Sequence, residues 1–222
     1  DYRYTDNFID NTLVDEIVLI DVSNSKKHRN LFYDIVKKIS KSCFVPITVG
    51  GYINDINEIS KFQNLGADKI LINSLIHEND KMVIEITKQY GSQFVIGGID
   101  LSLDDNVYKI YTNHGRKLLN INIENCLKKF EKCKIGEILV QSIDRDGSLR
   151  GYDNKINRVI KEKTNLPVIV CGGAGNWDHF IEAFETSKID GACTNNIYHY
   201  SEKSISLIKK TLNKKGIYVR TE

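Results

Sequence analysis

The segment PVIVCGGAG at residues 167–175 decides the fold of this chain, because its pattern already occurs in VPITVGG at residues 45–51. Val49-Gly50-Gly51 recurs 122 residues later as Cys171-Gly172-Gly173. In both segments a short β-branched apolar run ends in glycine, which is typical of a buried parallel strand that leads into a loop. The chain therefore contains two copies of one structural unit, and its fold has to accommodate a duplication.

Apolar runs of the same kind occur seven times, and amphipathic segments lie between them. We expect parallel strands in EIVLIDVS (16–23), VPITVGG (45–51), KILINSLI (69–76), QFVIGGIDLS (93–102), EILVQSIDRDG (137–147), PVIVCGGAG (167–175) and GACTNNIYH (191–199). Apolar residues at three- and four-residue spacing predict helices over 31–42, 56–66, 81–91, 122–133, 177–187 and 204–216. A polar hairpin at about 104–120 interrupts the alternation after the fourth run.

Strands that alternate with helices predict a parallel sheet, either open and doubly wound or closed into a barrel. The duplication favours a (β/α)8 TIM barrel built from two half-barrel repeats, at about 1–92 and 93–222. Ile99-Asp100 opens the second half, and its counterpart would lie before residue 1, so we expect the first strand to be missing from this sequence. Without a linker-like stretch, residues 1–222 are expected to form a single domain.

The composition is that of a globular chain, since 41% of its 222 residues are hydrophobic and 27% are charged. Thirty-one Lys and Arg against 29 Asp and Glu give a formal charge of +2, which argues against nucleic-acid binding. No membrane span and no secretory signal are visible. Five cysteines without a CxxC pair indicate reduced thiols in a cytoplasmic protein. We expect no metal and no cofactor.

Two aspartates are candidate catalytic residues, because the loops after the carboxyl ends of barrel strands build the active site. Asp100 follows the apolar run VIGGI, and a carboxyl group at the end of a buried strand has few structural uses. Asp146 lies in IDRDG and is the second candidate, although Asp146-Gly147 is also a common turn pair. Both side chains are of the type that serves as a general acid or base.

Two glycine-bearing turns, each beside an Asn-containing loop, predict two anion sites on opposite sides of the barrel. Glycine lets backbone amides approach phosphate oxygens, and a following helix N-terminus favours the negative charge. A substrate phosphorylated at both ends would match this symmetry, although a glycine pair can also serve the turn alone. The candidate binding residues are Gly50, Gly51, Asn73, Ser74, Gly147, Gly172, Gly173, Asn195 and Asn196.

Five long segments carry a resemblance to a known family: VGGYI (49–53), LGADKILIN (65–73), YGSQFVIGGID (90–100), GEILVQSIDRDGSLRGYD (136–153) and PVIVCGGAGNWDHFIEAF (167–184). From about Val14 to Arg220 the chain resembles the cyclase subunit of imidazole glycerol phosphate synthase. The most specific part is SIDRDG followed by GYD and GGAG.

The resemblance implies a (β/α)8 barrel that receives ammonia from a glutaminase subunit and joins it to a doubly phosphorylated sugar-type substrate. Asp100 matches one of two acid–base groups, and the other would lie on the first strand. One phosphate site matches Asp146, Gly147, Gly173, Asn195 and Asn196, and the second matches Gly51, Asn73 and Ser74. A charged gate for ammonia matches Glu16, Lys69 and Glu137, and the glutaminase interface matches Asp68 and Gln93.

Some positions depart from the family pattern. Tyr52 stands in place of a third glycine, and Leu101-Ser102 stands in place of Ala-Lys. Segments such as 28–51 and 108–117 look closer to a divergent branch that is associated with amidation of nucleotide-linked sugars in surface glycans. We therefore expect an amidation synthase of that branch. The alternatives are the true cyclase of histidine biosynthesis, a sugar-phosphate isomerase of the related half-barrel family, and a non-catalytic activator of the glutaminase.

Overall fold

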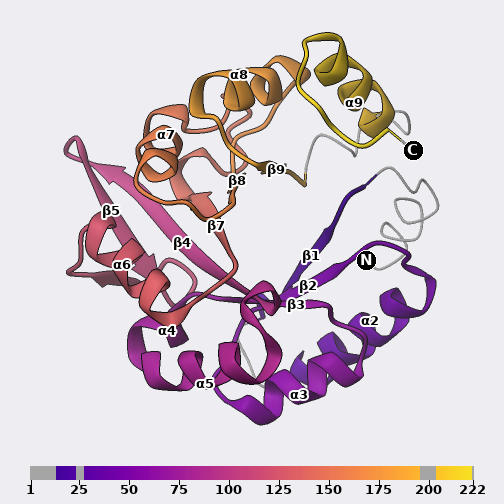
Figure 1. Ribbon diagram of the computed structural model, residues 1–222, viewed down its shortest axis with the longest axis vertical. Coiled ribbons are helices and arrows are strands. Elements are labelled where there is room, and N and C mark those ends of the chain that lie inside the picture. Colours follow the sequence, from indigo (N-terminus) through magenta and orange to yellow (C-terminus); the bar gives the residue numbers. More distant parts are fainter. Residues whose placement is uncertain (1–13, 24–27, 196–203, 222) are drawn as a thin grey trace.

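The computed structural model describes residues 14–23, 28–195 and 204–221, and a curled parallel sheet forms its centre (Figure 1). The strand order is β1-β2-β3-β4-β7-β8-β9, and all six pairings along this path are parallel. The strands are β1 (Ile17–Ile20), β2 (Ile47–Gly50), β3 (Lys69–Ile72), β4 (Val95–Asp104), β7 (Glu137–Ser142), β8 (Val168–Cys171) and β9 (Gly191–Cys193). The seven predicted strands are confirmed, and the fold is of the α/β TIM-barrel type.

Helices follow the strands and cover the convex side of the sheet (Figure 1). They are α2 (Arg29–Ser42), α3 (Ile56–Asn64), α4 (Ser74–Glu78), α5 (Asp80–Tyr90), α6 (Ile123–Cys133), α7 (Asn154–Glu162), α8 (Trp177–Ser187) and α9 (Ser204–Lys214). The six predicted helices are present, while α4 and α7 were not predicted. α4 has five residues, which are too few for a periodic pattern. In α7 the apolar residues Ile156, Val159 and Ile160 do recur at three- and four-residue spacing, so this helix was predictable from the sequence.

The two ends of the sheet are β1 and β9, and each of them pairs on one side only within the described residues. The sheet curls far enough to bring the helix that follows β9 to the start of β1. Lys209 of α9 forms an ion pair of 2.7 Å with Asp15, which comes two residues before β1. Arg220 contacts the same carboxylate at 3.1 Å. These contacts join the first and the last described elements.

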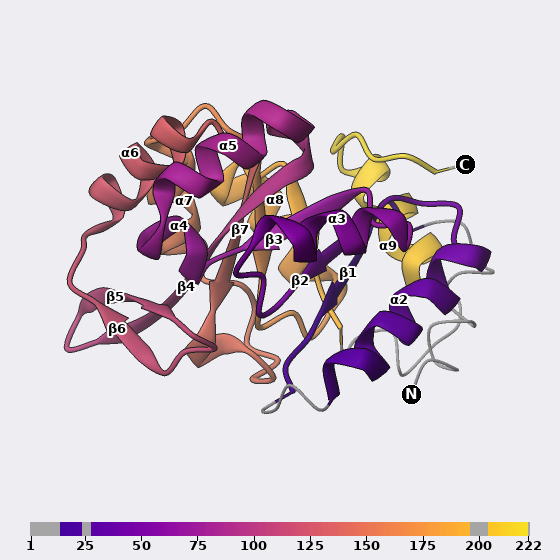
Figure 2. The same cartoon turned by 90° about the horizontal axis from the view of Figure 1, so that it is seen from below.

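The polar hairpin extends the central strand of the sheet beyond the barrel. The inner part of β4 pairs with β3 and β7, and its outer part pairs antiparallel with β5 (Val107–Thr112). The strand β6 (Lys117–Leu119) completes the hairpin. In Figure 2 the hairpin projects on the side of the molecule where β1 ends. The hairpin therefore lies at the carboxyl ends of the strands, where the predicted site residues are.

The two halves of the barrel repeat the same backbone contacts. The amide of Ile17 donates to the carbonyl of Pro46 in the first half, and Ile138 donates to Pro167 in the second half. These pairs are 121 residues apart, and the same interval holds in the turns that follow β2 and β8. The interval of 122 that the glycine pairs suggested is therefore wrong by one residue in these turns. Gly51 corresponds to Gly172, and Tyr52 corresponds to Gly173.

The core lies between the sheet and its helices, and it consists mainly of Ile, Val, Leu and Phe. Phe62 on α3 and Phe130 on α6 are the largest fully buried side chains. Glycine is required where α6 packs on β4, because a Cβ atom on Gly97 would lie 2.7 Å from the ring of Phe130. None of the helices in the described ranges is long and apolar enough to span a membrane.

Candidate functional site

Asp100 lies on β4 at the point where this strand leaves the barrel and enters the hairpin. It pairs with Gln141 of β7 on one side and with Tyr111 of β5 on the other. Burial raises the pKa of Asp100 to about 6, although a hydrogen bond from the side chain of Asn73 acts in the opposite direction. A carboxyl group that titrates near neutrality can exchange protons with a substrate.

Asn73 and Ser74, at the end of β3, connect the barrel to the hairpin. The side-chain amide of Asn73 donates to the carbonyl of Tyr111 at 3.3 Å. The backbone amide of Asn113 donates to the hydroxyl of Ser74 at 3.0 Å. Asn73 therefore lies beside Asp100, and its side-chain oxygen is buried without a hydrogen-bond partner among the described residues.

The predicted glycine turns after β2 and β8 have nearly the same geometry. Gly51 has a φ of +90°, and Gly172 has a φ of +94°. A Cβ atom on Gly51 would lie 2.3 Å from the carbonyl oxygen of Asp21, and one on Gly172 would lie 2.7 Å from that of Ser142. Both turns therefore need glycine for packing against the preceding strand, whether or not they bind phosphate. Gly50 itself is the last, buried residue of β2.

Two further glycines of the site, Gly173 and Gly147, differ in the space that a side chain would have, so their substitutions can be compared. A Cβ atom on Gly173 would lie 2.2 Å from the carbonyl oxygen of Gly151, whereas one on Gly147 would meet nothing within 4 Å. Both residues have positive φ, at +105° and +71°. We expect Gly147→Ala to cost about 1 kcal/mol of unfolding free energy, and Gly173→Ala to cost about 1–3 kcal/mol more. Urea unfolding of both variants checks this, and equal losses would contradict the described contact.

The loop after β7 contains Asp146, which is exposed and makes no side-chain hydrogen bond within the described residues. Its neighbour Asp144 has a structural role that the sequence analysis did not find. The carboxylate of Asp144 accepts hydrogen bonds from the hydroxyl of Ser102 at 2.7 Å and from the amide of Leu103 at 2.6 Å. Asp144 therefore holds this loop against the outer part of β4.

A second link to the hairpin comes from the GYD motif. The hydroxyl of Tyr108 on β5 lies 3.0 and 3.1 Å from the two carboxylate oxygens of Asp153, and burial together with this carboxylate raises the pKa of Tyr108 to about 12. Asp153 also caps α7 by accepting from the amide of Ile156. Neither link was predicted, because residues 42 and 45 positions apart give no local pattern.

The three predicted gate residues meet at the opposite, amino-terminal ends of the strands. The amine of Lys69 lies 2.8 Å from a carboxylate oxygen of Glu16 and 2.8 Å from one of Glu137. These residues begin β3, precede β1 and begin β7, which are alternate strands of the sheet. Side chains from alternate strands can meet only on the concave face, as they do in the layers of a TIM barrel. The three groups thus form a charged layer across the barrel interior.

The charged layer is held in place by further contacts. Burial alone would lower the pKa of Lys69, but its hydrogen bonds to Glu137 and Glu16 outweigh this effect and raise the pKa. Lys69 is therefore a cation at neutral pH. Thr48 of β2 is fully buried and donates its hydroxyl hydrogen bond to Glu16.

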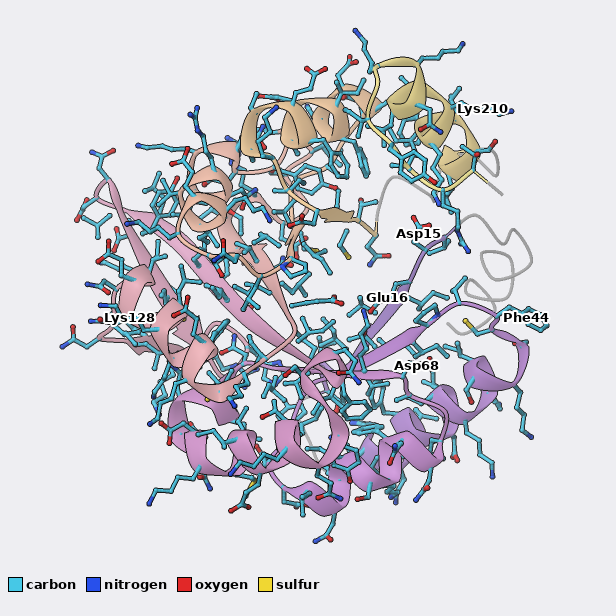
Figure 3. All side chains as sticks on the ribbon, viewed as in Figure 1. Asp15, Glu16, Phe44, Asp68, Lys128 and Lys210 are labelled. Atoms are coloured by element: carbon cyan, nitrogen blue, oxygen red, sulfur yellow. The ribbon has the colours of Figure 1, made fainter. Side chains whose placement is uncertain are left out.

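Asp68 and Gln93, the predicted interface residues, are exposed. Asp68 immediately precedes β3, and Gln93 lies in the short 3-10 helix Ser92–Phe94 that leads into β4. Figure 3 shows Asp68 near Glu16, in the middle of this face, while Phe44 lies at the rim. One carboxylate oxygen of Asp68 accepts from the amide of Ile47 at 2.8 Å. Both predicted interface residues thus lie at the end of the barrel that carries the charged layer.

The remaining predicted residues lie after β9. Asn195 is exposed and follows this strand, whereas Asn196 lies outside the described residues. Within the described ranges, no group of three or more His, Cys, Asp or Glu side chains could hold a metal ion. The five cysteines are free thiols.

Fold and site together define a TIM-barrel-like protein with an acidic group at the carboxyl-end face and a charged layer at the amino-end face. A family model described as "Histidine biosynthesis protein" matches residues 4–204, and the chain belongs to this enzyme family. It is 36% identical to "Imidazole glycerol phosphate synthase subunit HisF" of Hydrogenobaculum sp. (strain Y04AAS1) over 207 residues, which are 93% of this chain and 82% of the relative. The proteins of the same name from Thermococcus onnurineus (strain NA1) and Clostridium botulinum (strain Langeland) are 37% and 38% identical, with the same shares covered.

Proposed function

We propose that this chain is the ammonia-using, cyclase-type subunit of an imidazole glycerol phosphate synthase and works with a glutaminase subunit. The observation that carries the proposal is the Lys69–Glu16–Glu137 layer at one end of the barrel, with Asp100 at the other end. A sugar-phosphate isomerase would gain little from a charged layer remote from its acid–base groups. The names of the relatives support the same activity.

Each end of the barrel has its own task in this proposal. The charged layer controls the entry of ammonia, which Lys69 regulates by its ion pairs with the two glutamates. Asp100 transfers a proton to or from the acceptor during ring closure, and its raised pKa suits it to this task near neutral pH. The turns around Gly51 and Gly172–Gly173 hold the phosphates of the acceptor through backbone amides. Asp68 and Gln93 contact the glutaminase.

The histidine-pathway acceptor replaces the glycan acceptor as the favoured substrate, because the relatives carry the name of the histidine enzyme. Amidation of a nucleotide-linked sugar stays as the second candidate function, and one observation on the turn after β2 favours it. Tyr52 has a φ of +51°, and its ring lies 4.4 Å from that of His114 in the hairpin turn. A side chain therefore occupies the turn position at which Gly173 stands in the other half.

Complementation tests the choice between these two acceptors. The gene of this chain, expressed with its glutaminase in a histidine auxotroph that lacks the cyclase subunit, is expected to restore growth without histidine. An Asp100→Asn variant serves as the negative control. Lack of growth, with both proteins present and soluble, would reject the histidine acceptor and favour the sugar acceptor.

A further inference from the structure

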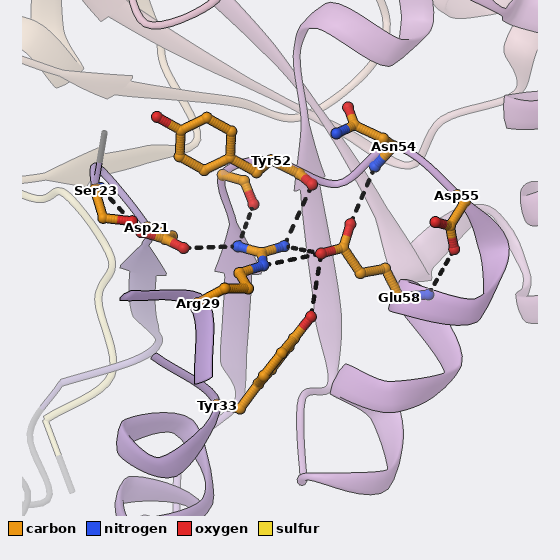
Figure 4. A network of polar contacts seen from close by, with 9 residues as sticks. Asp21, Ser23, Arg29, Tyr33, Tyr52, Asn54, Asp55 and Glu58 are labelled. Carbon is orange, nitrogen blue, oxygen red and sulfur yellow. Dashed lines mark hydrogen bonds and ion pairs between the residues drawn. The ribbon is translucent and has the colours of Figure 1, made fainter. Parts of the chain in front are cut away.

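Arg29, the first residue of α2, places every N–H of its guanidinium group on an acceptor (Figure 4). Nε and Nη2 donate to Glu58 of α3 at 2.8 and 2.6 Å. Nη1 donates to the carboxylate of Asp21 at 2.9 Å and to the carbonyl of Gly51 at 2.8 Å. Nη2 also donates to the carbonyl of Tyr52 at 3.3 Å. One side chain thus joins the loop after β1, the turn after β2 and the start of α3.

The surroundings fix this guanidinium in place. Only 11% of the Arg29 side chain is exposed, and the rings of Tyr33 and Phe62 lie 5.4 and 5.0 Å from its central carbon. Burial would raise the pKa of Asp21, but hydrogen bonds from Ser23 and Arg29 outweigh this effect and lower it. The acid is therefore ionised and holds the arginine from the side opposite to Glu58.

The second half of the barrel contains the same turn, but among the described residues no arginine side chain donates to it; Arg145 donates to the carbonyls of Arg150 and Gly151 instead. The carbonyl of Gly173, which corresponds to that of Tyr52, accepts a hydrogen bond of 2.8 Å from the backbone amide of Gly151. The turns match two positions further on as well. The amide of Asn54 donates to Glu58 at 3.2 Å, and the amide 121 residues later, of Gly175, donates to His179 at 3.0 Å.

The same carbonyl therefore receives a donor in both halves, from the main chain in one and from a long side chain in the other. A backbone donor is fixed by its own loop, whereas a side-chain donor can be removed by one substitution. The turn that depends on Arg29 is the one that keeps Tyr52 at positive φ and its ring against His114.

We propose that Arg29 is a positioning residue that holds the turn 51–54 in the shape in which it binds the acceptor. This inference rests on the proposed function, because it assigns the turn to acceptor binding. Arg29 acts through the carbonyls of Gly51 and Tyr52 and does not itself contact the reacting atoms.

The first test is Arg29→Lys, followed by hydrogen exchange and mass spectrometry. Lysine keeps the charge but has a single amine instead of the planar guanidinium group. It therefore cannot donate to the loop after β1, the turn after β2 and the start of α3 at the same time. We expect faster exchange in residues 50–58 and unchanged exchange in β8, which lies in the other half. Arg158→Lys is the matched control, because Arg158 on α7 is 65% exposed and, within the described part of the chain, pairs only with Glu162 on its own helix. Unchanged exchange in 50–58 would overturn the inference.

The second test is kinetic and separates positioning from simple stabilisation. With ammonia as the nitrogen source, Arg29→Lys should raise the KM for the acceptor roughly tenfold and change kcat by less than about threefold. In Arg29→Ala, tens of millimolar guanidinium should restore part of the lost affinity, while it should not affect Arg158→Ala. A variant with faster exchange but an unchanged KM would show a merely structural role and reject the proposal.

The positioning role of Arg29 can be tested even if the proposed function is wrong. If the wild-type protein does not turn over the histidine-pathway acceptor, titration with inorganic phosphate replaces the KM measurement. Weaker phosphate binding by Arg29→Lys than by Arg158→Lys then supports the positioning role, and equal binding rejects it.

Discussion

Asp100→Asn is expected to lower ammonia-dependent turnover at least about 10²-fold without unfolding the barrel, because a group that transfers a proton in the transition state is lost. Asparagine has the same shape and keeps a polar contact with Asn73, so far-UV circular dichroism should be unchanged. Asp104→Asn is the control, since this carboxylate lies on the same strand but is 52% exposed and, among the described residues, forms an ion pair with Lys109 alone. A near-normal rate of Asp100→Asn would remove Asp100 from the mechanism.

The pKa of about 6 gives this prediction a pH dependence. In the wild-type protein, turnover at a fixed concentration of free ammonia should fall as the pH drops through about 6, because Asp100 then becomes protonated. The residual turnover of Asp100→Asn should not fall in this pH range, whereas that of Asp104→Asn should fall as in the wild type. A wild-type profile that is flat between pH 5 and 8 would contradict the assignment of Asp100 as the titrating group.

Stability should change in the opposite sense. The folded state binds the proton of Asp100 more tightly than the unfolded state, so its stability falls as the pH rises from about 4 to about 6. Above pH 6 the buried carboxylate is unfavourable in the folded protein. Asp100→Asn is therefore expected to be about 1–3 kcal/mol more stable than the wild type at pH 8. Denaturant unfolding of both proteins at pH 4 and pH 8 checks this. The variant should be the more stable protein at pH 8, and the difference in unfolding free energy should disappear at pH 4.

Lys69→Ala is expected to abolish the coupling between the two subunits rather than the synthesis itself. Glutamine-dependent turnover should fall roughly tenfold or more, while turnover with added ammonia should be retained or raised. The reason is that Lys69 lies in the charged layer and not at the carboxyl-end face, where Asp100 lies. Assays with the two nitrogen sources, run on the same preparation with its glutaminase, give this ratio directly.

Two results would contradict this expectation. Equal losses of turnover with both nitrogen sources would indicate that the substitution damages the fold in general. No loss with either source would favour the alternative that the protein is a sugar-phosphate isomerase. Lys132→Ala is a matched control, because Lys132 also pairs with an acid but is 61% exposed on α6. Loss of Lys69 leaves Glu16 and Glu137 without their shared cation, which should cost about 1–3 kcal/mol of stability. Because the pKa of Lys69 is raised, this loss should be constant from pH 6 to pH 9.

The sequence predicts the seven strands and six of the helices because each has a local or repeated pattern, whereas the charged layer was expected from the resemblance to the cyclase family. Alternating apolar runs mark the strands, and Glu16, Lys69 and Glu137 each begin or precede a run. The same pattern places Asp100 at a strand end, but in the structure β4 continues past Asp100 to Asp104 in the hairpin. Once strand order is known, side chains at the same height on alternate strands have to meet inside the barrel.

The contacts that hold the loops could not be predicted from the sequence. Arg29 and Glu58 are 29 positions apart, and nothing in either segment indicates the other. Asp144 reads as an ordinary turn residue, although it binds the backbone of β4. The one-residue error in the repeat has a similar cause. Two adjacent glycines permit two alignments, and three-dimensional contacts such as those of Gly51 with Asp21 and of Gly172 with Ser142 choose between them.

The continuity of β4 has a consequence for how the acceptor would be sensed. This strand runs unbroken from the barrel through Asp100 into the hairpin. Asp144 accepts from the amide of Leu103 in its outer part, and Asn73 donates to the carbonyl of Tyr111 in the paired strand β5. The hairpin and Asp100 are thus parts of one continuous strand. If the acceptor binds against the hairpin, we expect a displacement of the hairpin to be transmitted along the backbone of β4 to Asp100.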